Sequence, residues 1–133
     1  MKSLVVDDDV TSRKVLEGVL SGFGPVDCCG DGQCAVRAAA TALQAAEPYD
    51  LISMDLQMPL MSGLEAIQMI RRQEELSGRP HAARIVVITS SQENGDVNEA
   101  FRQLADAYIV KPINREGFLD VVDYLCPAGA LNR

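Results

Sequence analysis

The feature that most constrains the fold of this 133-residue chain is a regular alternation of short apolar runs and longer segments with helical periodicity. The apolar runs lack the alternating polar residues of a strand with one solvent-exposed face, so we expect strands that are buried on both faces. Such strands form a parallel sheet with crossover helices on both sides. The expected strands are residues 4–6, 25–29, 51–54, 85–88 and 108–110.

Between these runs, apolar residues recur at helical spacing. Candidate N-caps are Asp31, Ser62 and Asn114, because their side chains can accept from the free N–H groups of a first helical turn. We therefore predict an α/β fold in which five strands alternate with five helices, as one domain over residues 1–133 without an output domain. The helical stripes lie within residues 15–23, 36–43, 64–70, 97–104 and 118–125.

The charge balance restricts the classes of partner. The chain carries a formal net charge of -7. An acidic surface repels phosphate backbones and anionic lipids, so we expect no nucleic-acid binding. No apolar run approaches the ~20 residues that a membrane-spanning helix requires, and no signal peptide is evident. We therefore expect no membrane insertion.

The chain contains four cysteines: Cys28, Cys29, Cys34 and Cys126. The vicinal pair Cys28-Cys29 cannot be bridged without strain, and no C-x-x-C pair is present to bind zinc. We therefore expect four reduced thiols in a cytoplasmic protein.

Polar residues follow four of the five expected strands. Because ligands of a parallel sheet gather at the carboxyl ends of its strands, we expect these residues to lie close together. Each of these strand ends carries a different chemistry: acids, a single acid, hydroxyls and an ammonium group. The residues are Asp7, Asp8, Asp9, Asp55, Thr89, Ser90, Ser91 and Lys111.

Several carboxylates at one edge are costly, since two bare charges about 4 Å apart repel by about 4 kcal/mol at an effective dielectric near 20. Oxygen ligands in that number suit a hard divalent ion, most simply Mg²⁺. Together with the ammonium group of Lys111, such an ion makes a site for a transferring phosphoryl group. One of the carboxylates can then be the nucleophile and form an acyl phosphate.

These residues resemble the receiver domain of two-component response regulators. The resemblance covers nearly the whole chain and implies a stand-alone, CheY-like receiver with a flavodoxin-like doubly wound sheet of strand order 2-1-3-4-5. It rests on Val5-Val6-Asp7-Asp8, Met54-Asp55-Leu56-Gln57-Met58-Pro59 with Ser62-Gly63, Val87-Ile88-Thr89-Ser90 and Tyr108-Ile109-Val110-Lys111-Pro112.

The resemblance implies that Asp55 accepts a phosphoryl group from a phosphohistidine on a sensor histidine kinase or a histidine phosphotransfer protein. It also implies that Mg²⁺ is bound directly by Asp8, Asp55 and the backbone carbonyl of Gln57. Asp7 would act through a metal-bound water. The chain would be a phosphoacceptor signalling protein rather than an enzyme, with intrinsic autophosphorylation from small phosphodonors and autodephosphorylation.

By the same resemblance, Thr89 turns its hydroxyl toward the new phosphoryl group and Lys111 pairs with it. Tyr108 then swings inward and alters the face formed by the expected fourth helix (within residues 97–104), the fifth strand (108–110) and the fifth helix (within residues 118–125). This face would contact a downstream protein target. The Lys111-Pro112 peptide is expected to be cis. We expect a monomer or a weak dimer.

Two alternatives remain open at this point. The run Asp7-Asp8-Asp9-Val10-Thr11 also fits a haloacid-dehalogenase-like phosphatase, with Asp7 as the nucleophile and Asp9 as the general acid. A receiver-like interaction module that is never phosphorylated is the other alternative. In the receiver interpretation, Asp9 is a third acid that either caps the first helix or tunes metal affinity.

Overall fold

The computed structural model describes residues 1–56, 58, 61–80, 82–89 and 104–127. These residues include one five-stranded sheet of order β2-β1-β3-β4-β5, in which all neighbouring strands are parallel. The predicted fold class and strand order are confirmed. The strands are Ser3–Val6 (β1), Val26–Cys29 (β2), Leu51–Asp55 (β3), Arg84–Thr89 (β4) and Ala107–Val110 (β5).

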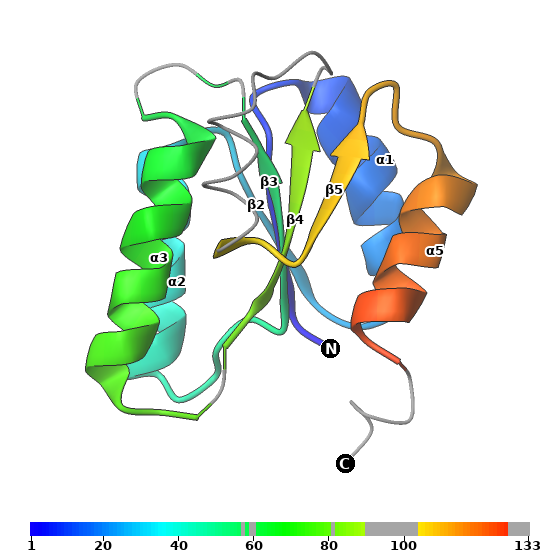
Figure 1. The fold of residues 1–133 in the computed structure, drawn as a ribbon. Helices are drawn as coiled ribbons and strands as arrows, with labels where there is room; N and C mark the ends of the chain where they lie inside the picture. The colour runs from blue at the N-terminus through cyan, green and yellow to red at the C-terminus, as the bar shows by residue number, and fades with distance from the viewer. Residues whose placement is uncertain (57, 59–60, 81, 90–103, 128–133) are drawn as a thin grey trace.

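Four helices are found among the described residues, and they cover both faces of the sheet (Figure 1). Helices α2 and α3 lie on one face, and helices α1 and α5 lie on the other. The predicted fourth helix, within residues 97–104, falls almost wholly outside the described residues. Within the described ranges, no helix combines the length and apolar character needed to cross a bilayer. The helices are Val10–Leu20 (α1), Gly32–Gln44 (α2), Gly63–Ser77 (α3) and Arg115–Leu125 (α5).

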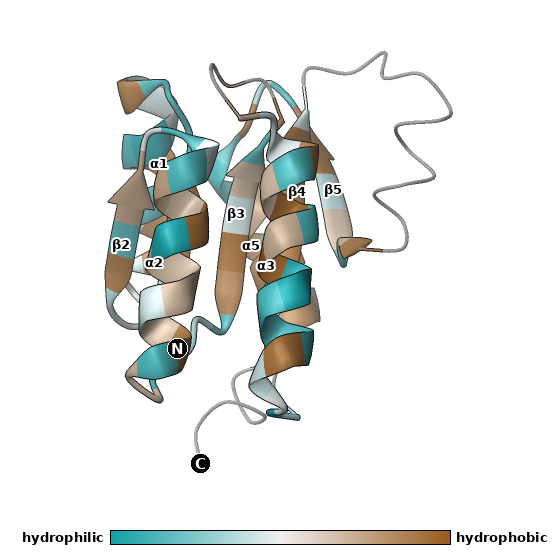
Figure 2. Ribbon diagram, turned by 90° about the vertical axis from the view of Figure 1, so that its left-hand side faces the viewer, coloured by the Kyte–Doolittle hydropathy of each residue, from teal (hydrophilic) through white to brown (hydrophobic). Residues whose placement is uncertain are grey.

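The hydrophobic core consists of two layers, one on each side of the sheet. Ile52 and Met54 of β3 belong to the layer under α2 and α3, whereas Leu51 belongs to the layer under α1 and α5. This division follows from the alternation of side chains along a strand. Hydrophilic residues lie along α2 and α3 on the side away from the sheet (Figure 2). The expectation of strands buried on both faces is therefore confirmed for the central strands.

All three predicted N-caps are confirmed. The side chain of Asp31 accepts from the backbone N–H of Cys34, Ser62 accepts from Glu65, and Asn114 accepts from Gly117. Each cap satisfies a first-turn N–H that has no partner within its helix.

The prediction of four reduced thiols is wrong for two of the cysteines. Cys29 and Cys34 form a disulfide, with their Cα atoms 5.6 Å apart. Cys29 ends β2 and Cys34 lies in the first turn of α2, so the strand-to-helix turn brings the two residues within the usual range for a disulfide. Cys28 and Cys126 are free.

Arg71 of α3 connects this helix to the beginnings of β4 and β5. Its guanidinium donates to the carbonyl of Leu104 at 2.9 Å and to the carbonyl of Ala83 at 2.8 Å. It also donates to the carboxylate of Asp106 at 3.2 Å, and this carboxylate accepts from the N–H of Ile85. Arginine can satisfy several acceptors at once because its planar group carries five N–H donors.

Gly63, the first residue of α3, lies directly against the backbone that carries Asp55. A Cβ atom at position 63 would be 2.7 Å from the carbonyl oxygen of Asp55 and 2.9 Å from the Cα of Leu56. Both are backbone atoms, so they cannot move aside as the end of a flexible side chain can. The absence of a side chain at position 63 therefore fixes how closely α3 approaches the end of β3.

We expect Gly63→Ala to lower the free energy of unfolding by about 1–3 kcal/mol, because the added methyl group forces a backbone shift. Gly18→Ala is the matched control: Gly18 is exposed within α1, and the nearest atom to its added Cβ would be 3.5 Å away. This control substitution should raise the free energy of unfolding by about 0.5–1 kcal/mol, because alanine has a higher helix propensity than glycine. Urea denaturation checks both, and a Gly63→Ala protein as stable as wild type would contradict the close contact.

Candidate functional site

The structure brings three predicted acids together at the carboxyl edge of the sheet. Asp7 and Asp8 follow β1, and Asp55 is the last residue of the neighbouring β3. Each acid offers one carboxylate oxygen, and these oxygens all lie within 4.8 Å of one another. Asp7 and Asp55 are buried, with 0% and 1% of their surface exposed, whereas Asp8 is exposed. The cluster therefore has a buried floor and one side chain open to solvent.

Asp7 shows the electrostatic strain of this arrangement most clearly. Burial, and secondarily the carboxylate of Asp55, raises the pKa of Asp7 to about 6. The N–H of Asp9, which donates to Oδ1 of Asp7 at 2.9 Å, and the charge of Lys111 oppose this shift. The buried Oδ2 of Asp7 accepts no hydrogen bond from the described residues. An additional positive charge would therefore be well placed here.

Lys111 reaches the cluster from the other side. Its Nζ lies 3.4 Å from Oδ1 of Asp55. The backbone N–H of Lys111 donates to the carbonyl of Thr89 at 2.7 Å, which joins the ends of β4 and β5. The Lys111-Pro112 peptide is cis, as expected.

Thr89 and Tyr108 occupy the strands that lead to this edge. Thr89 ends β4 and is buried, with 4% of its surface exposed. Tyr108 lies on β5, is half-buried, and packs against the core layer under α2 and α3. Gln57 lies outside the described residues, so the expected role of its carbonyl stays a prediction.

Asp9, the third acid of the run, serves a different purpose. It is the N-cap of α1, and its carboxylate accepts from the N–H and the hydroxyl of Ser12. These hydrogen bonds lower the pKa of Asp9. Of the two roles that the sequence left open, helix capping is the one that the structure shows.

Arg13 is a residue of this region that the sequence analysis missed. Its Nη1 donates to the backbone carbonyl of Asp7 at 3.0 Å and lies beside Gly30. Arg13 therefore connects the turn after β1 to the turn after β2. Its place in α1 offers no sequence signal for this contact, because the acceptor is a backbone carbonyl.

The residues present suit a hard divalent cation. Carboxylate oxygens are its preferred ligands, and the buried, unsatisfied Oδ2 of Asp7 together with the raised pKa of Asp7 indicates missing positive charge. The cluster thus has the oxygen ligands, and lacks the compensating positive charge, that are typical of a site for a divalent cation such as Mg²⁺.

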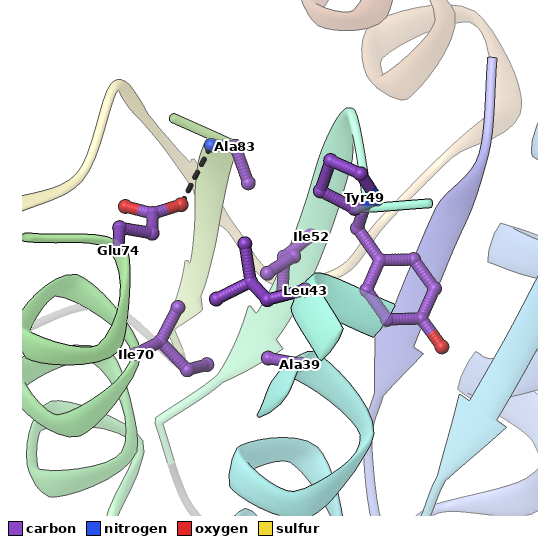
Figure 3. A pocket seen from close by; sticks show the side chains of 8 residues that line it. Ala39, Leu43, Tyr49, Ile52, Ile70, Glu74 and Ala83 are labelled. Carbon is purple, nitrogen blue, oxygen red and sulfur yellow. Dashed lines mark hydrogen bonds between the residues drawn. The ribbon is translucent and has the colours of Figure 1, made fainter. Parts of the chain in front are cut away.

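A second hollow, between α2 and α3, does not compete with this site (Figure 3). Its volume is about 10 Å³, roughly the space for one water molecule. The only ionisable carboxylate on its wall is that of Glu74, which accepts from the N–H of Ala83 at 2.8 Å and from Arg71 at 2.7 Å. The hollow lies near the amino-terminal ends of β3 and β4, at the end of the sheet away from the acids.

In the metal-free protein, we expect the contribution of Asp7 to the free energy of unfolding to fall as the pH rises from about 4 to about 6. The native state holds the proton of Asp7 more tightly than the unfolded chain does, so deprotonation favours unfolding over this range. In EDTA at pH 7.5, Asp7→Asn should therefore raise the free energy of unfolding by about 1–3 kcal/mol. At pH 4, where Asp7 is protonated, the gain should vanish.

Asp9→Asn is the matched control for this prediction, because asparagine also caps helices and the pKa of Asp9 is shifted downward instead. At pH 7.5 the carboxylate of Asp9 is charged, and its hydrogen bonds with Ser12 stabilise the folded protein. Removing this charge should therefore not stabilise the protein. Urea denaturation at both pH values measures the effects. A lack of stabilisation by Asp7→Asn at pH 7.5 would contradict the raised pKa.

Comparisons with known proteins agree on one family. A family model described as the response regulator receiver domain matches residues 3–123. The chain is 32% identical to a two-component response regulator of Oryza sativa subsp. japonica, over 87% of this chain and 87% of the relative. It is also 32% identical to the hybrid signal transduction histidine kinase G of Dictyostelium discoideum, over 96% of this chain but only 4% of the kinase.

Solved structures show the same relationship. The receiver domain of the histidine kinase CKI1 from Arabidopsis thaliana, complexed with Mg²⁺ and BeF3⁻, matches 93% of this chain at 31% identity, covers 88% of its own length and has a TM-score of 0.81. The receiver domain of a sensor histidine kinase from Pseudomonas aeruginosa, with magnesium coordinated in its active-site cleft, covers 93% of this chain and 95% of its own at 28% identity and a TM-score of 0.74. The chain belongs to the response regulator receiver domain family of two-component systems.

Proposed function

We propose that this chain is the phosphoacceptor of a two-component phosphorelay, and that Asp55 takes a phosphoryl group from a phosphohistidine on a sensor histidine kinase or a histidine phosphotransfer protein. The observation that carries the proposal is the environment of Asp55. Its carboxylate lies 3.4 Å from the ammonium group of Lys111 and within the cluster that it forms with Asp7 and Asp8. Membership of the receiver family sets aside the dehalogenase-like phosphatase with Asp7 as the nucleophile.

In the proposed step, a carboxylate oxygen of Asp55 attacks phosphorus while the phosphorus–nitrogen bond to the donor histidine breaks. The electron pair of that bond returns to the imidazole nitrogen, and Asp55 becomes an acyl phosphate. The phosphoryl group carries roughly two negative charges, and it replaces the single charge of the carboxylate. Lys111 stabilises this charge, and Thr89 at the end of β4 supplies a hydroxyl donor.

Asp8 and Asp55 would hold Mg²⁺ directly, together with the backbone carbonyl of Gln57, and Asp7 would act through a bound water. The ion would neutralise the crowded carboxylates and the charge of the incoming phosphoryl group. The magnesium complexes of the two related receiver domains support this assignment. The same site would accept small phosphodonors and would slowly hydrolyse its own acyl phosphate.

The output we propose is a change in the face formed by β5, α5 and the helix that the sequence predicts within residues 97–104, which lie almost wholly outside the described residues. Thr89 would move toward the phosphoryl group, and Tyr108 would follow it inward from its half-buried position on β5. A local electrostatic gain becomes a surface change only through an element with two packed arrangements. This surface would contact a protein target.

The surrounding pathway is also part of the proposal. The chain spans 4% and 13% of the first curated kinases that it matches, but 87% of the rice response regulator. We propose a single receiver domain over residues 1–133 that acts in the cytoplasm as a monomer or weak dimer. Its output would be protein contact without nucleic-acid binding.

We expect acetyl phosphate with Mg²⁺ to add one phosphoryl group per chain, as measured by intact-protein mass spectrometry. Asp55→Asn should abolish this adduct, because the amide is a far weaker nucleophile than the carboxylate. Asp9→Asn is the matched control, since Asp9 caps α1 outside the cluster, and it should retain the adduct. EDTA should suppress labelling in the wild type.

Two outcomes would contradict the proposal. An adduct that persists in Asp55→Asn would place the phosphoryl group on another residue. No adduct in the folded, magnesium-supplied wild type, under conditions that label a known receiver domain, would favour the interaction module that is never phosphorylated.

A further inference from the structure

Three cysteines gather at the carboxyl end of β2, and they fall into two environments. Side chains alternate across a strand, so Cys28 and Cys29 point to opposite faces of the sheet. The sulfur of Cys28 lies 3.5 Å from a carboxylate oxygen of Glu17 on α1. Cys29 belongs to the core layer under α2 and forms the disulfide with Cys34 in the first turn of that helix.

We propose that Cys29 and Cys34 form a reversible thiol–disulfide exchange site whose oxidant is a small-molecule disulfide of the glutathione class. The two thiols differ in accessibility in a way that suits two successive steps. Cys34 is half-buried, whereas only 5% of Cys29 is exposed. Cys34 is therefore the thiol that an outside disulfide can reach, and Cys29 is the thiol that resolves the product.

Cys34 lies in the first turn of α2 and lines a surface groove. It lies three residues after the N-cap Asp31, and its backbone N–H donates to that side chain at 2.8 Å. Arg37, also on α2, lines the same surface groove as both bridged cysteines and Cys28; the groove has a volume of about 550 Å³ and can admit a small disulfide.

Cys28 is exposed but is poorly suited to this reaction. Burial of its sulfur, and next the carboxylate of Glu17, raises the pKa of Cys28. A larger fraction of it is then the unreactive thiol at neutral pH. Cys28 and the buried Cys126 are therefore internal controls for the proposed pair.

The oxidation of the two cysteines takes place in two exchange steps. The thiolate of Cys34 attacks one sulfur of the small disulfide, a mixed disulfide forms, and one small thiolate leaves. The thiolate of Cys29 then attacks the sulfur of Cys34 and expels the second small thiolate. The two protons from the cysteines go to the leaving thiolates, so two protein thiols become one disulfide and the small disulfide is reduced to two thiols.

A backbone hydrogen bond connects the disulfide to the acidic cluster. The carbonyl of Cys29 accepts from the N–H of Asp7 at 3.0 Å. On the other side of the turn, a Cβ atom at Gly32 would lie 3.0 Å from the carbonyl of Met61, which lies in the segment between Asp55 and α3. Closing the disulfide therefore joins the first turn of α2 to the residue whose carbonyl accepts from the N–H of Asp7.

The test starts from protein reduced with dithiothreitol, freed of reductant and incubated with oxidised glutathione. Remaining thiols are alkylated, and the digested protein is mapped by mass spectrometry. In wild type, we expect Cys29 and Cys34 to appear as a crosslinked peptide that carries no glutathione. Incubation with reduced glutathione should then restore both thiols. Cys126→Ser should behave like wild type, whereas Cys34→Ser should form no internal crosslink.

The second measurement is the amide spectrum of ¹⁵N-labelled protein in the oxidised and reduced states. We expect the Asp7 amide to shift between the two states in wild type and in Cys126→Ser, but not in Cys34→Ser. Dispersed spectra of each variant show that it is folded, and Cys28→Ser provides a second background that keeps both bridged cysteines.

The proposal is overturned if Cys29 and Cys34 stay fully alkylated after oxidation. A crosslink through Cys28, or a crosslink between two chains, would overturn it equally, as would glutathione retained on Cys34. An Asp7 amide that is identical in the two oxidation states would reject the connection to the acidic cluster.

Discussion

Three carboxylates are held together at one edge of the sheet despite their mutual repulsion, and this is the strongest electrostatic constraint on the site. Burial removes the water that would otherwise stabilise Asp7 and Asp55, and the pKa of Asp7 rises as a result. Among the described residues, the N–H of Asp9 and the ammonium group of Lys111 oppose this rise. A buried cluster of carboxylates with so little compensating positive charge attracts cations.

The packing of the domain makes this arrangement possible. Two apolar layers hold the central strands in register, so that β1 and β3 end side by side. Gly63 lets α3 start in contact with the carbonyl of Asp55, and Arg71 ties the same helix to the beginnings of β4 and β5. The cluster is therefore supported by backbone contacts and hydrogen bonds that involve none of its own carboxylates.

Much of this could be predicted because the signals are local. Strands buried on both faces produce unbroken apolar runs, and the observed β4 differs from the expected 85–88 by only one residue at each end. Asp31 and Ser62 could be predicted as caps, because each side chain accepts from a backbone N–H only three residues later in the chain. The Cys29–Cys34 disulfide could not be predicted from spacing, because a strand-to-helix turn is what brings these two residues together.

The amino-acid sequence alone determined the fold class, the strand order through its resemblance to the receiver family, and the set of polar residues at the strand ends. Which of these residues share a site depends on the packed fold: Asp7, Asp8 and Asp55 converge, whereas Asp9 caps α1. The packed fold also decided the contacts of Arg71, whose partner Asp106 is 35 residues away. The physical reason is that periodicity and caps depend on neighbours along the chain, whereas distances between strand ends depend on how the whole sheet packs.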